Sequence, residues 1–376
     1  MKSLTIGMIG AGQVAKSHVL GFSSLPVLYG THLPKIEFST IAEMNEELAK
    51  DAARRFGFRN WTVDWRKVTR SKEVELVDIV TPTHLHVEPA IDAAQHHKHI
   101  ICEKPLATNS EQARQMYEAA QRAGIVHIVG FNYRKLAAVA FAKALIDEGK
   151  LGKIYHFRGS FMEDWGADPN FNFTWRFQSA KAAAGALADL GSHVIDLARH
   201  LLGEIRSVCA VRRTFVHERP LPGANSKRGK VDADDTFMCL LEFENDVIGR
   251  IEASWLAHGR KVHLEFELNG SDGSLYFNLE RPNELQIYSS EDPKDRQGYR
   301  TILMGPVHPF GNGIVFPAPG TGMGFQESLT NEVYDLVKGI QEKQKVSPSF
   351  YDGWKVNQVI DAIIESAEKR RWQAIG

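Results

Sequence analysis

A pattern of small residues near the start of the chain limits its fold more than any other feature. Residues 4–9 form an apolar run that predicts a buried strand, and Gly10-Ala11-Gly12-Gln13-Val14-Ala15 follows it and opens a helical stretch to about residue 25. After a strand, Gly10 permits a tight turn, Gly12 lets a pyrophosphate approach the helix N-terminus, and Ala15 allows close helix–sheet packing. The pattern predicts a dinucleotide-binding α/β domain, with a coincidental turn as the alternative.

Strands and helices alternate through the first third of the chain. Strands are predicted at 36–42, 76–80, 100–102 and 126–129, and helices at 46–56, 86–95 and 110–122. This alternation predicts a doubly wound parallel sheet. Glu43 follows the second strand, where a carboxylate would accept hydrogen bonds from ribose hydroxyls and favour NAD. The alternative for Glu43 is a solvated acid at the start of a helix.

The stretch 100–105 ends a predicted buried strand in Glu103, Lys104 and Pro105. Open α/β sheets bind ligands at the carboxyl ends of their strands, so we expect chemistry there. The alternative is a solvated strand end with an incidental ion pair. Further polar residues follow a neighbouring strand and would either line the same crevice or form an interdomain junction: Asn132, Tyr133 and Arg134.

From about residue 151 the pattern changes to strands separated by turn residues. The predicted strands are 154–162, 208–216, 235–243, 247–255, 262–269, 274–277 and 284–288. They predict an α+β domain with a large, mostly antiparallel sheet. Two amphipathic helices are expected near the end of the chain, at 325–342 and 353–372. Because 376 residues exceed the ~100–200 of one typical domain, we expect two domains, 1–134 and 135–376.

Composition narrows the range of partners. The net charge of −1, with acids and bases interspersed, gives no reason to expect nucleic acid or a membrane surface, so a small molecule is the expected partner. No apolar run approaches the ~18–20 residues of a membrane span. Three widely spaced cysteines favour a reducing compartment, with the cytoplasm as the default. His96 and His97 are sequence neighbours that cannot share a helix face, so we expect no metal site there.

A predicted helix between the first two strands of the second domain carries an acid and an imidazole on one side. Asp189 and His193 are four residues apart, and Asp196 follows three residues later, so these side chains share a helical face. A carboxylate beside an imidazole suits a general base with an orienting acid. A satisfied core histidine is the alternative.

Aromatic and polar residues that suit a sugar gather between residues 157 and 177. Trp165 or Trp175 would cover the apolar face of a pyranose, while Glu163, Arg176 and Tyr133 would make directional hydrogen bonds. The alternative places the tryptophans in the core. This segment has no tight Lys/Arg cluster, which disfavours a phosphorylated sugar.

Several of these motifs together resemble one family. They are Gly10-Ala11-Gly12, Glu103-Lys104-Pro105, Gly130-Phe131-Asn132-Tyr133-Arg134, the Asp189/Gly191/His193/Asp196 helix, and Pro348-Ser349-Phe350-Tyr351-Asp352-Gly353 with Asp361-Ala362. The chain resembles the Gfo/Idh/MocA family, which includes glucose–fructose oxidoreductase and inositol dehydrogenases. The resemblance covers essentially the whole chain. One departure is Gly185-Ala186, where many relatives have paired glycines.

The resemblance implies a Rossmann domain followed by an open-faced sheet domain, often joined into dimers or tetramers through the sheets. It implies catalytic roles for Lys104, Asp189 and His193, and NAD as cofactor. The implied cofactor contacts are Gly10, Gly12, Gln13, Val14, Glu43, Thr81, Pro82, His86, Glu103, Lys104 and Asn132. The implied substrate contacts are Tyr133, Glu163, Trp165, Arg176, Asp189 and His193. Within the family the 157–169 segment looks most like members that oxidise levoglucosan, expected at C3, and next like inositol dehydrogenases.

The implied reaction removes a hydride from the carbon of a secondary alcohol and a proton from its oxygen. His193 would accept the proton, Asp189 would stabilise the imidazolium, and Lys104 would donate a hydrogen bond to the developing alkoxide. Lys104 as the base stays open.

Two different functions also stay open for a chain with these motifs. One is an NAD-dependent glycoside hydrolase that oxidises its substrate transiently and then eliminates. The second is a sugar-sensing regulator, which would be expected to lack Lys104 or His193. A biliverdin-reductase-like enzyme would need a large apolar slot, of which the sequence shows no sign.

Overall fold

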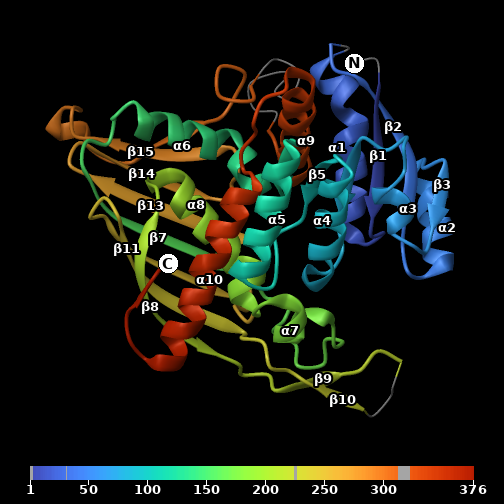
Figure 1. Cartoon of the computed structure of the whole chain (residues 1–376). Coiled ribbons are helices and arrows are strands. Elements are labelled where there is room, and N and C mark those ends of the chain that lie inside the picture. The colour runs from blue at the N-terminus through green and yellow to red at the C-terminus, as the bar shows by residue number, and fades with distance from the viewer. Residues whose placement is uncertain (1–2, 31, 224–226, 312–321) are drawn as a thin grey trace. The chain divides into compact units, whose positions relative to one another are not determined.

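The computed structural model of the chain describes residues 3–30, 32–223, 227–311 and 322–376 (Figure 1). The chain divides into two compact units, one formed by residues 1–132 and 325–357 and the other by residues 133–324 and 358–376. Residues 325–357, expected in the second domain, thus pack with the first unit. The division of function between domains 1–134 and 135–376 stays a prediction.

The first unit is built on a six-stranded parallel sheet in the order β3-β2-β1-β4-β5-β6. Its strands are β1 (Ser3–Ile9), β2 (Lys35–Ala42), β3 (Asn60–Thr62), β4 (Leu76–Ile79), β5 (His99–Cys102) and β6 (His127–Val129). Its helices are α1 (Gln13–Tyr29), α2 (Glu46–Phe56), α3 (Arg66–Thr69), α4 (Val87–Gln95), α5 (Ser110–Ala123) and α9 (Phe325–Glu342). The predicted doubly wound sheet is confirmed, and its order reverses between β1 and β4, where such sheets bind ligands.

Helix α9 belongs to this unit because it packs along α1. The rings of Tyr29 and Tyr334 stack with centroids 3.8 Å apart, and the Tyr29 hydroxyl donates a hydrogen bond to Asn331. Gly21 faces α9 at this contact, and a Cβ atom there would lie 3.4 Å from a methyl group of Val333. Helix α9 therefore covers one side of α1.

The second unit is built on a nine-stranded sheet in the order β16-β15-β14-β13-β7-β12-β11-β8-β17. Its strands are β7 (Ile154–Met162), β8 (Ile205–Arg213), β11 (Thr236–Phe243), β12 (Ile248–Ser254), β13 (His263–Gly270), β14 (Gly273–Asn278), β15 (Glu284–Ser289), β16 (Arg300–Leu303) and β17 (Gln373–Ala374). Strands β7 and β12 pair in parallel and the remaining neighbours are antiparallel, so the predicted mostly antiparallel sheet is confirmed. A separate hairpin joins β9 (Glu218–Pro220) to β10 (Arg228–Lys230).

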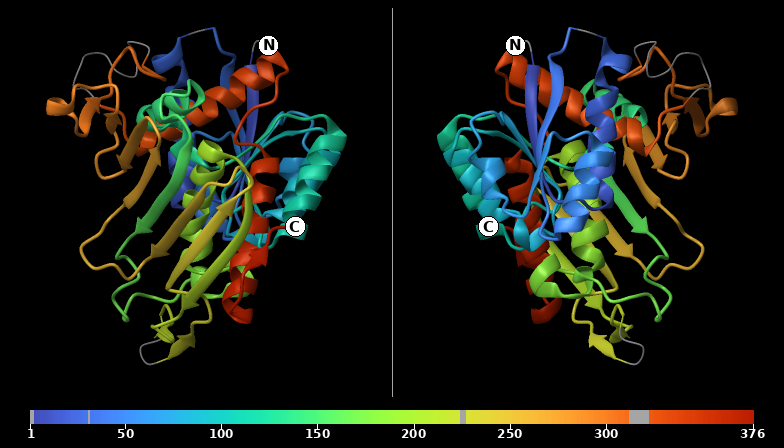
Figure 2. Two further views of the ribbon diagram at one scale, coloured as in Figure 1. Left: turned by 90° about the vertical axis from the view of Figure 1, so that its left-hand side faces the viewer. Right: turned by 90° about the vertical axis from the view of Figure 1, so that its right-hand side faces the viewer.

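Helices cover one face of this large sheet. Helix α8 (Ser192–Leu202) packs on β7 and β12, and α6 (Ala137–Asp147) packs on β14 and β15 (Figure 1). Phe157 and Phe161 of β7 and Phe237 of β11 are buried in the core. The left view of Figure 2 looks onto the opposite face, where alternate residues such as Met238 and Leu240 are exposed.

Two further helices differ greatly in length. Helix α7 (Ser179–Ala182) is short, whereas α10 (Phe350–Lys369) is long and runs through residue 357, where the two units meet in the sequence. The Ser366 hydroxyl accepts a hydrogen bond from the backbone N–H of Ala210 on β8. In the ranges that the structure describes, none of the helices combines the length and apolar character of a membrane span.

Candidate active site

Two glycines shape the turn between β1 and α1. Gly10 has a φ of +104°, and a Cβ atom there would lie 2.8 Å from the carbonyl oxygen of Val80. Only glycine suits both conditions. A Cβ atom at Gly12 would have no described atom within 4 Å, and Ala15 is fully buried. The backbone at Gly12 therefore borders open space at the start of α1, and this fits a bound pyrophosphate.

Glu43 lies beside this turn, at the carboxyl end of β2. Its Oε2 atom accepts a hydrogen bond of 3.3 Å from the backbone N–H of Ala11, and its Oε1 atom accepts one of 3.2 Å from that of Asn45. The carboxylate is thus held next to the glycine turn, where the ribose of a dinucleotide would be bound. Met44, the next residue, is largely exposed and carries no positive charge.

The residues after β4 and β6 are fixed by contacts within the first unit. His86 is buried, with Nε2 2.8 Å from the carbonyl oxygen of Thr81 and Nδ1 3.2 Å from that of Leu106, so it ties two loops together. Burial lowers the pKa of His86 despite these carbonyl contacts. Asn132 is buried and donates a hydrogen bond of 2.8 Å to Ser328 on α9.

Glu103 and Lys104 follow β5, and the Glu103 side chain turns toward helix α1. Its Oε1 atom lies 3.1 Å from Nε2 of His18, and its Oε2 atom accepts a hydrogen bond of 3.1 Å from the backbone N–H of Lys104. Burial opposes ionisation of Glu103, but His18 and the Lys104 charge outweigh it, so the pKa of Glu103 is lowered. We therefore describe Glu103 as a carboxylate. The sequence did not predict its contact with His18.

The second unit holds the predicted imidazole, His193, at the start of α8. His193 is buried, and its ring centroid lies 4.5 Å from that of Tyr133 and 6.0 Å from that of Phe161. Asp196, expected on the same face as His193, forms a buried ion pair with Arg134. Tyr133, Arg134 and His193 are therefore brought together in this unit.

Asp189 lies in a π-helical turn, Leu187–Gly191, that precedes α8. Its Oδ2 atom is 3.5 Å from Nε of Arg176, whose guanidinium group stacks over the ring of Trp175 at 4.6 Å. This places three predicted site residues side by side, Trp175, Arg176 and Asp189. Arg176 is thereby held by both the ring and the carboxylate.

Asp234, which the sequence did not single out, fixes the start of this turn. Its carboxylate accepts hydrogen bonds from the backbone N–H groups of Gly185 at 3.0 Å and Leu187 at 2.9 Å. A Cβ atom at Gly185 would lie 1.8 Å from the Asp234 carbonyl oxygen, so only glycine fits there. The second position of the Gly185-Ala186 pair accepts alanine.

Trp165 packs into a cluster of aromatic rings. Its ring centroid lies 4.9 Å from that of Trp255, 5.5 Å from that of Phe171 and 5.8 Å from that of Phe177. Beneath the cluster the buried Arg219 places its guanidinium group 4.3 Å from the Phe177 ring centroid and donates hydrogen bonds to the carbonyl oxygens of Gly166 and Asp168. Arg219 therefore fixes the loop just after Trp165, at Gly166 and Asp168.

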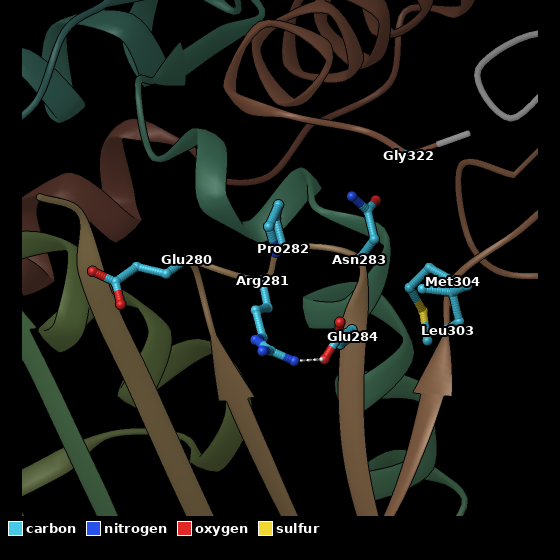
Figure 3. Close-up of a pocket in the computed structure, with 8 residues that line it drawn as sticks. All are labelled: Glu280, Arg281, Pro282, Asn283, Glu284, Leu303, Met304 and Gly322. Atoms are coloured by element: carbon cyan, nitrogen blue, oxygen red, sulfur yellow. Dashed lines mark hydrogen bonds and ion pairs between the residues drawn. The ribbon is translucent and has the colours of Figure 1, made fainter. Parts of the chain in front are cut away.

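A pocket of about 300 Å³ lies elsewhere in the second unit (Figure 3). It is lined by Glu280, Arg281, Pro282, Asn283, Glu284, Leu303, Met304 and Gly322, none of which is a predicted site residue. The Arg281 and Glu284 side chains point toward one another and form an ion pair of 3.2 Å. In the described part of the chain, no group of three or more His, Cys, Asp or Glu side chains has the arrangement of a metal site.

The predicted site residues thus fall into two groups. Gly10, Gly12, Gln13, Val14, Glu43, Thr81, Pro82, His86, Glu103, Lys104 and Asn132 belong to the first unit, whereas Tyr133, Glu163, Trp165, Trp175, Arg176, Asp189 and His193 belong to the second. The first group follows the strand ends of a parallel sheet. The second surrounds the start of α8 and the loop after β7.

Two family models match the chain. Residues 4–131 match the Gfo/Idh/MocA description "Oxidoreductase family, NAD-binding Rossmann fold", and residues 139–276 match the Gfo/Idh/MocA C-terminal domain. Levoglucosan dehydrogenase of Pseudarthrobacter phenanthrenivorans is 46% identical over 99% of this chain and 98% of that protein. The scyllo-inositol 2-dehydrogenase (NAD(+)) of Bacillus subtilis is 31% identical over 69% of this chain and 72% of that protein.

A solved structure agrees over the same length. Levoglucosan dehydrogenase in complex with NADH and levoglucosan superimposes with a TM-score of 0.96 at 46% identity, and 99% of each chain is covered. The predicted resemblance is confirmed. This chain belongs to the Gfo/Idh/MocA family of oxidoreductases, and residues 4–131 are its NAD-binding Rossmann domain.

Proposed function

We propose that this chain is a dehydrogenase that oxidises a ring secondary hydroxyl of a neutral sugar or cyclic polyol with NAD. The likeness over the whole chain to levoglucosan dehydrogenase carries the proposal. Its narrowest form is oxidation of levoglucosan at C3. A sugar-sensing regulator would have no need of Lys104 and His193, and this chain has both.

NAD, when bound, supplies the acceptor for the hydride. In the proposed mechanism His193 takes the proton from the hydroxyl, because an imidazole gains and loses protons near neutral pH. Asp189 stabilises the resulting imidazolium. Lys104 donates a hydrogen bond to the oxygen as negative charge develops on it. The opposite assignment makes Lys104 the base and His193 the hydrogen-bond donor to the oxygen.

The remaining predicted residues bind and orient. For the cofactor, we propose a pyrophosphate site at Gly10, Gly12, Gln13 and Val14 and a ribose site at Glu43, with Thr81, Pro82, His86, Glu103 and Asn132 shaping the rest. For the substrate, Tyr133, Glu163 and Arg176 form directional hydrogen bonds, and Trp165 covers the apolar face of the ring. An analogue that lacks a bonded hydroxyl would leave one of these polar groups without its substrate partner.

The test measures NADH formation with levoglucosan, glucose, galactose, xylose, the inositols and glucose 6-phosphate. We expect a neutral ring to be oxidised, with levoglucosan best. Preference for the phosphorylated sugar, or no reaction with any neutral ring, would overturn the proposal. Identification of the product by mass spectrometry separates a stable ketone from the product of oxidation followed by elimination.

We further propose that the protein is a cytoplasmic homo-oligomer. Cys102, Cys209 and Cys239 are free, as expected in a reducing compartment. On the face of the nine-stranded sheet opposite α8, Val211 and Met238 are directly paired across β8 and β11, and Leu240 is exposed near them. These apolar side chains suit contact with a second copy of the chain, since exposed apolar patches mark interaction surfaces.

A further inference from the structure

Three ionisable side chains meet inside the first unit, next to Lys104. Asp78 lies in the middle of the buried strand β4, and His18 projects from α1. His18 Nδ1 lies 3.0 Å and 3.1 Å from the two carboxylate oxygens of Asp78, and its Nε2 lies 3.1 Å from Oε1 of Glu103. The side chains of His18 and Asp78 are fully buried, whereas 13% of the Glu103 side chain is exposed.

The contacts of His18 define its protonation. Each ring nitrogen faces a carboxyl oxygen, so with Asp78 and Glu103 both ionised, both nitrogens donate and the ring is an imidazolium. Burial alone would lower the pKa of His18, but the charges and hydrogen bonds of Asp78 and Glu103 outweigh it and raise the pKa well above its usual value. A buried carboxylate in a central strand also needs such a partner.

The Glu103 carboxylate is confined from three directions. His18 holds Oε1, and the backbone N–H of Lys104 holds Oε2. Gly130, at the end of β6, leaves room on a third side, because a Cβ atom there would lie 2.6 Å from Oε1. The carboxylate is therefore fixed in one place and bonded to the backbone of the residue that follows it.

We infer that His18 is a positioning residue for Lys104. By holding Glu103 it fixes the backbone N–H of Lys104, and with it the point from which the lysine side chain extends at the end of β5. The inference rests on the proposed function of Lys104 in catalysis. It assigns a role in turnover to a helix residue that itself contacts neither substrate nor cofactor.

The experiment uses Asp78→Asn as the background, and the single Asp78→Asn variant is the reference for two double variants. Asp78→Asn removes one of the two carboxylates that contact His18, so that replacing His18 does not leave both of them buried without a positive partner. His18→Met in this background removes the donor to Glu103, whereas His18→Gln keeps an amide N–H that reaches it. We expect the Met variant to lose about 10²-fold in kcat, the order that a 1 Å misplacement costs. The Gln variant should recover most of that loss.

A second variant displaces Glu103 from the opposite side. Gly130→Ala leaves His18 intact and pushes on Oε1, so its kcat should fall. Tyr29→Phe is the control, since it removes a buried hydrogen bond from the same helix about three turns after His18, and should leave kcat unchanged. Folded His18→Met protein with full kcat, or equal kcat losses in the Met and Gln variants, would overturn the inference.

Crystal structures of the double variants test the inference without any activity measurement. The Glu103 carboxylate should leave the Lys104 N–H in the Met variant and keep it in the Gln variant. If the wild-type protein oxidises no sugar, the proposed function fails, but these structures still decide whether His18 places Glu103. A carboxylate that stays on Lys104 N–H in both variants would refute the positioning role.

Discussion

Arg134 and Asp196 form a two-point ion pair within the second unit, with Nε 2.7 Å from Oδ2 and Nη2 2.5 Å from Oδ1. Their side chains are 5% and 2% exposed. Arg134 directly follows Tyr133, and Asp196 lies one turn after His193 on α8. The ion pair therefore ties the segment that carries Tyr133 to the helix that carries His193, and so supports the contact between their rings.

Asp196→Ala should lower the free energy of unfolding by about 3–5 kcal/mol, because it leaves the Arg134 guanidinium buried without its carboxylate. Urea unfolding followed by tryptophan fluorescence measures the change. The matched control is Arg281→Ala, which breaks the solvent-exposed pair with Glu284 and should cost less than about 1 kcal/mol. Equal losses for the two variants would contradict the structural role of the Arg134–Asp196 pair.

Lys104→Met and His193→Ala should each reduce kcat by about 10²–10⁴, the range for lost acid–base catalysis. The fold, measured by circular dichroism, and the affinity for NADH should change little. Asp189→Asn removes the charge that would stabilise an imidazolium, so its loss should not add to that of His193→Ala in the double variant. An active, folded Lys104→Met/His193→Ala protein would rule out both assignments.

The chain should prefer NAD to NADP, because the Glu43 carboxylate would repel a 2′-phosphate and neither Met44 nor Asn45 supplies a positive charge. Initial rates with the two cofactors measure the preference. Glu43→Ala with Met44→Arg should raise kcat/KM for NADP relative to NAD, and Met44→Arg alone should do so less. A wild-type preference for NADP would show that Glu43 is not the ribose ligand.

Acid should destabilise the protein in part through His127. Burial lowers the pKa of His127 from 6.5 to about 4, and its Nδ1 accepts a hydrogen bond of 3.1 Å from the backbone N–H of Phe350. Between these two values the unfolded chain binds a proton that the folded chain does not, so stability falls as the pH drops from about 6.5 to 4 and this contribution then levels off. The loss amounts to roughly 3 kcal/mol at 1.36 kcal/mol per pKa unit.

His127→Asn offers an oxygen acceptor for the Phe350 N–H without a group that titrates in this range. The difference in unfolding free energy between the variant and the wild type, measured in urea at several pH values, should therefore shrink as the pH falls. A difference that is constant from pH 7 to pH 4 would contradict a buried neutral imidazole.

The oligomer should depend on the exposed face of the nine-stranded sheet. Met238→Lys with Leu240→Lys places two charges in the apolar patch and should convert the wild-type oligomer to monomer in light-scattering measurements. Val27→Lys, a charge on an exposed apolar residue of α1, is the control and should leave the mass unchanged. A double lysine variant of wild-type mass would place the interface elsewhere.

The parallel sheet could be predicted because its strands are short apolar runs separated by glycine and proline signals. Residues 46–56 were predicted as a helix with the bounds that α2 has. Helix α6 was not predicted, since its alanine-rich residues give no clear polar face. The edge strands β16 and β17 were also not predicted. With four and two residues, they are too short to show the alternation of apolar and polar residues that identifies a strand.

The strand-end position of Glu103 could be predicted, but its partners could not. His18 is 85 residues from Glu103 in the sequence, and Asp234 is 49 residues from Gly185, so only the folded chain brings them together. One signal was present: Asp78 interrupts an otherwise apolar strand, and a buried carboxylate requires a partner. The sequence does not say which residue that partner is.

The packing of α9 on α1 has a consequence for anyone who wishes to excise or graft the Rossmann domain. A fragment that stops at residue 134 would keep Tyr29 but lose Tyr334 and Asn331, and would leave the α9-facing side of α1 in water. A transplantable module would need two pieces of chain, 1–132 and 325–357, joined by a designed linker. A chimera with a single crossover would instead take α9 from the parent that supplies the large sheet. Helices α1 and α9 would then come from different parents, and their packing surfaces would have to be matched.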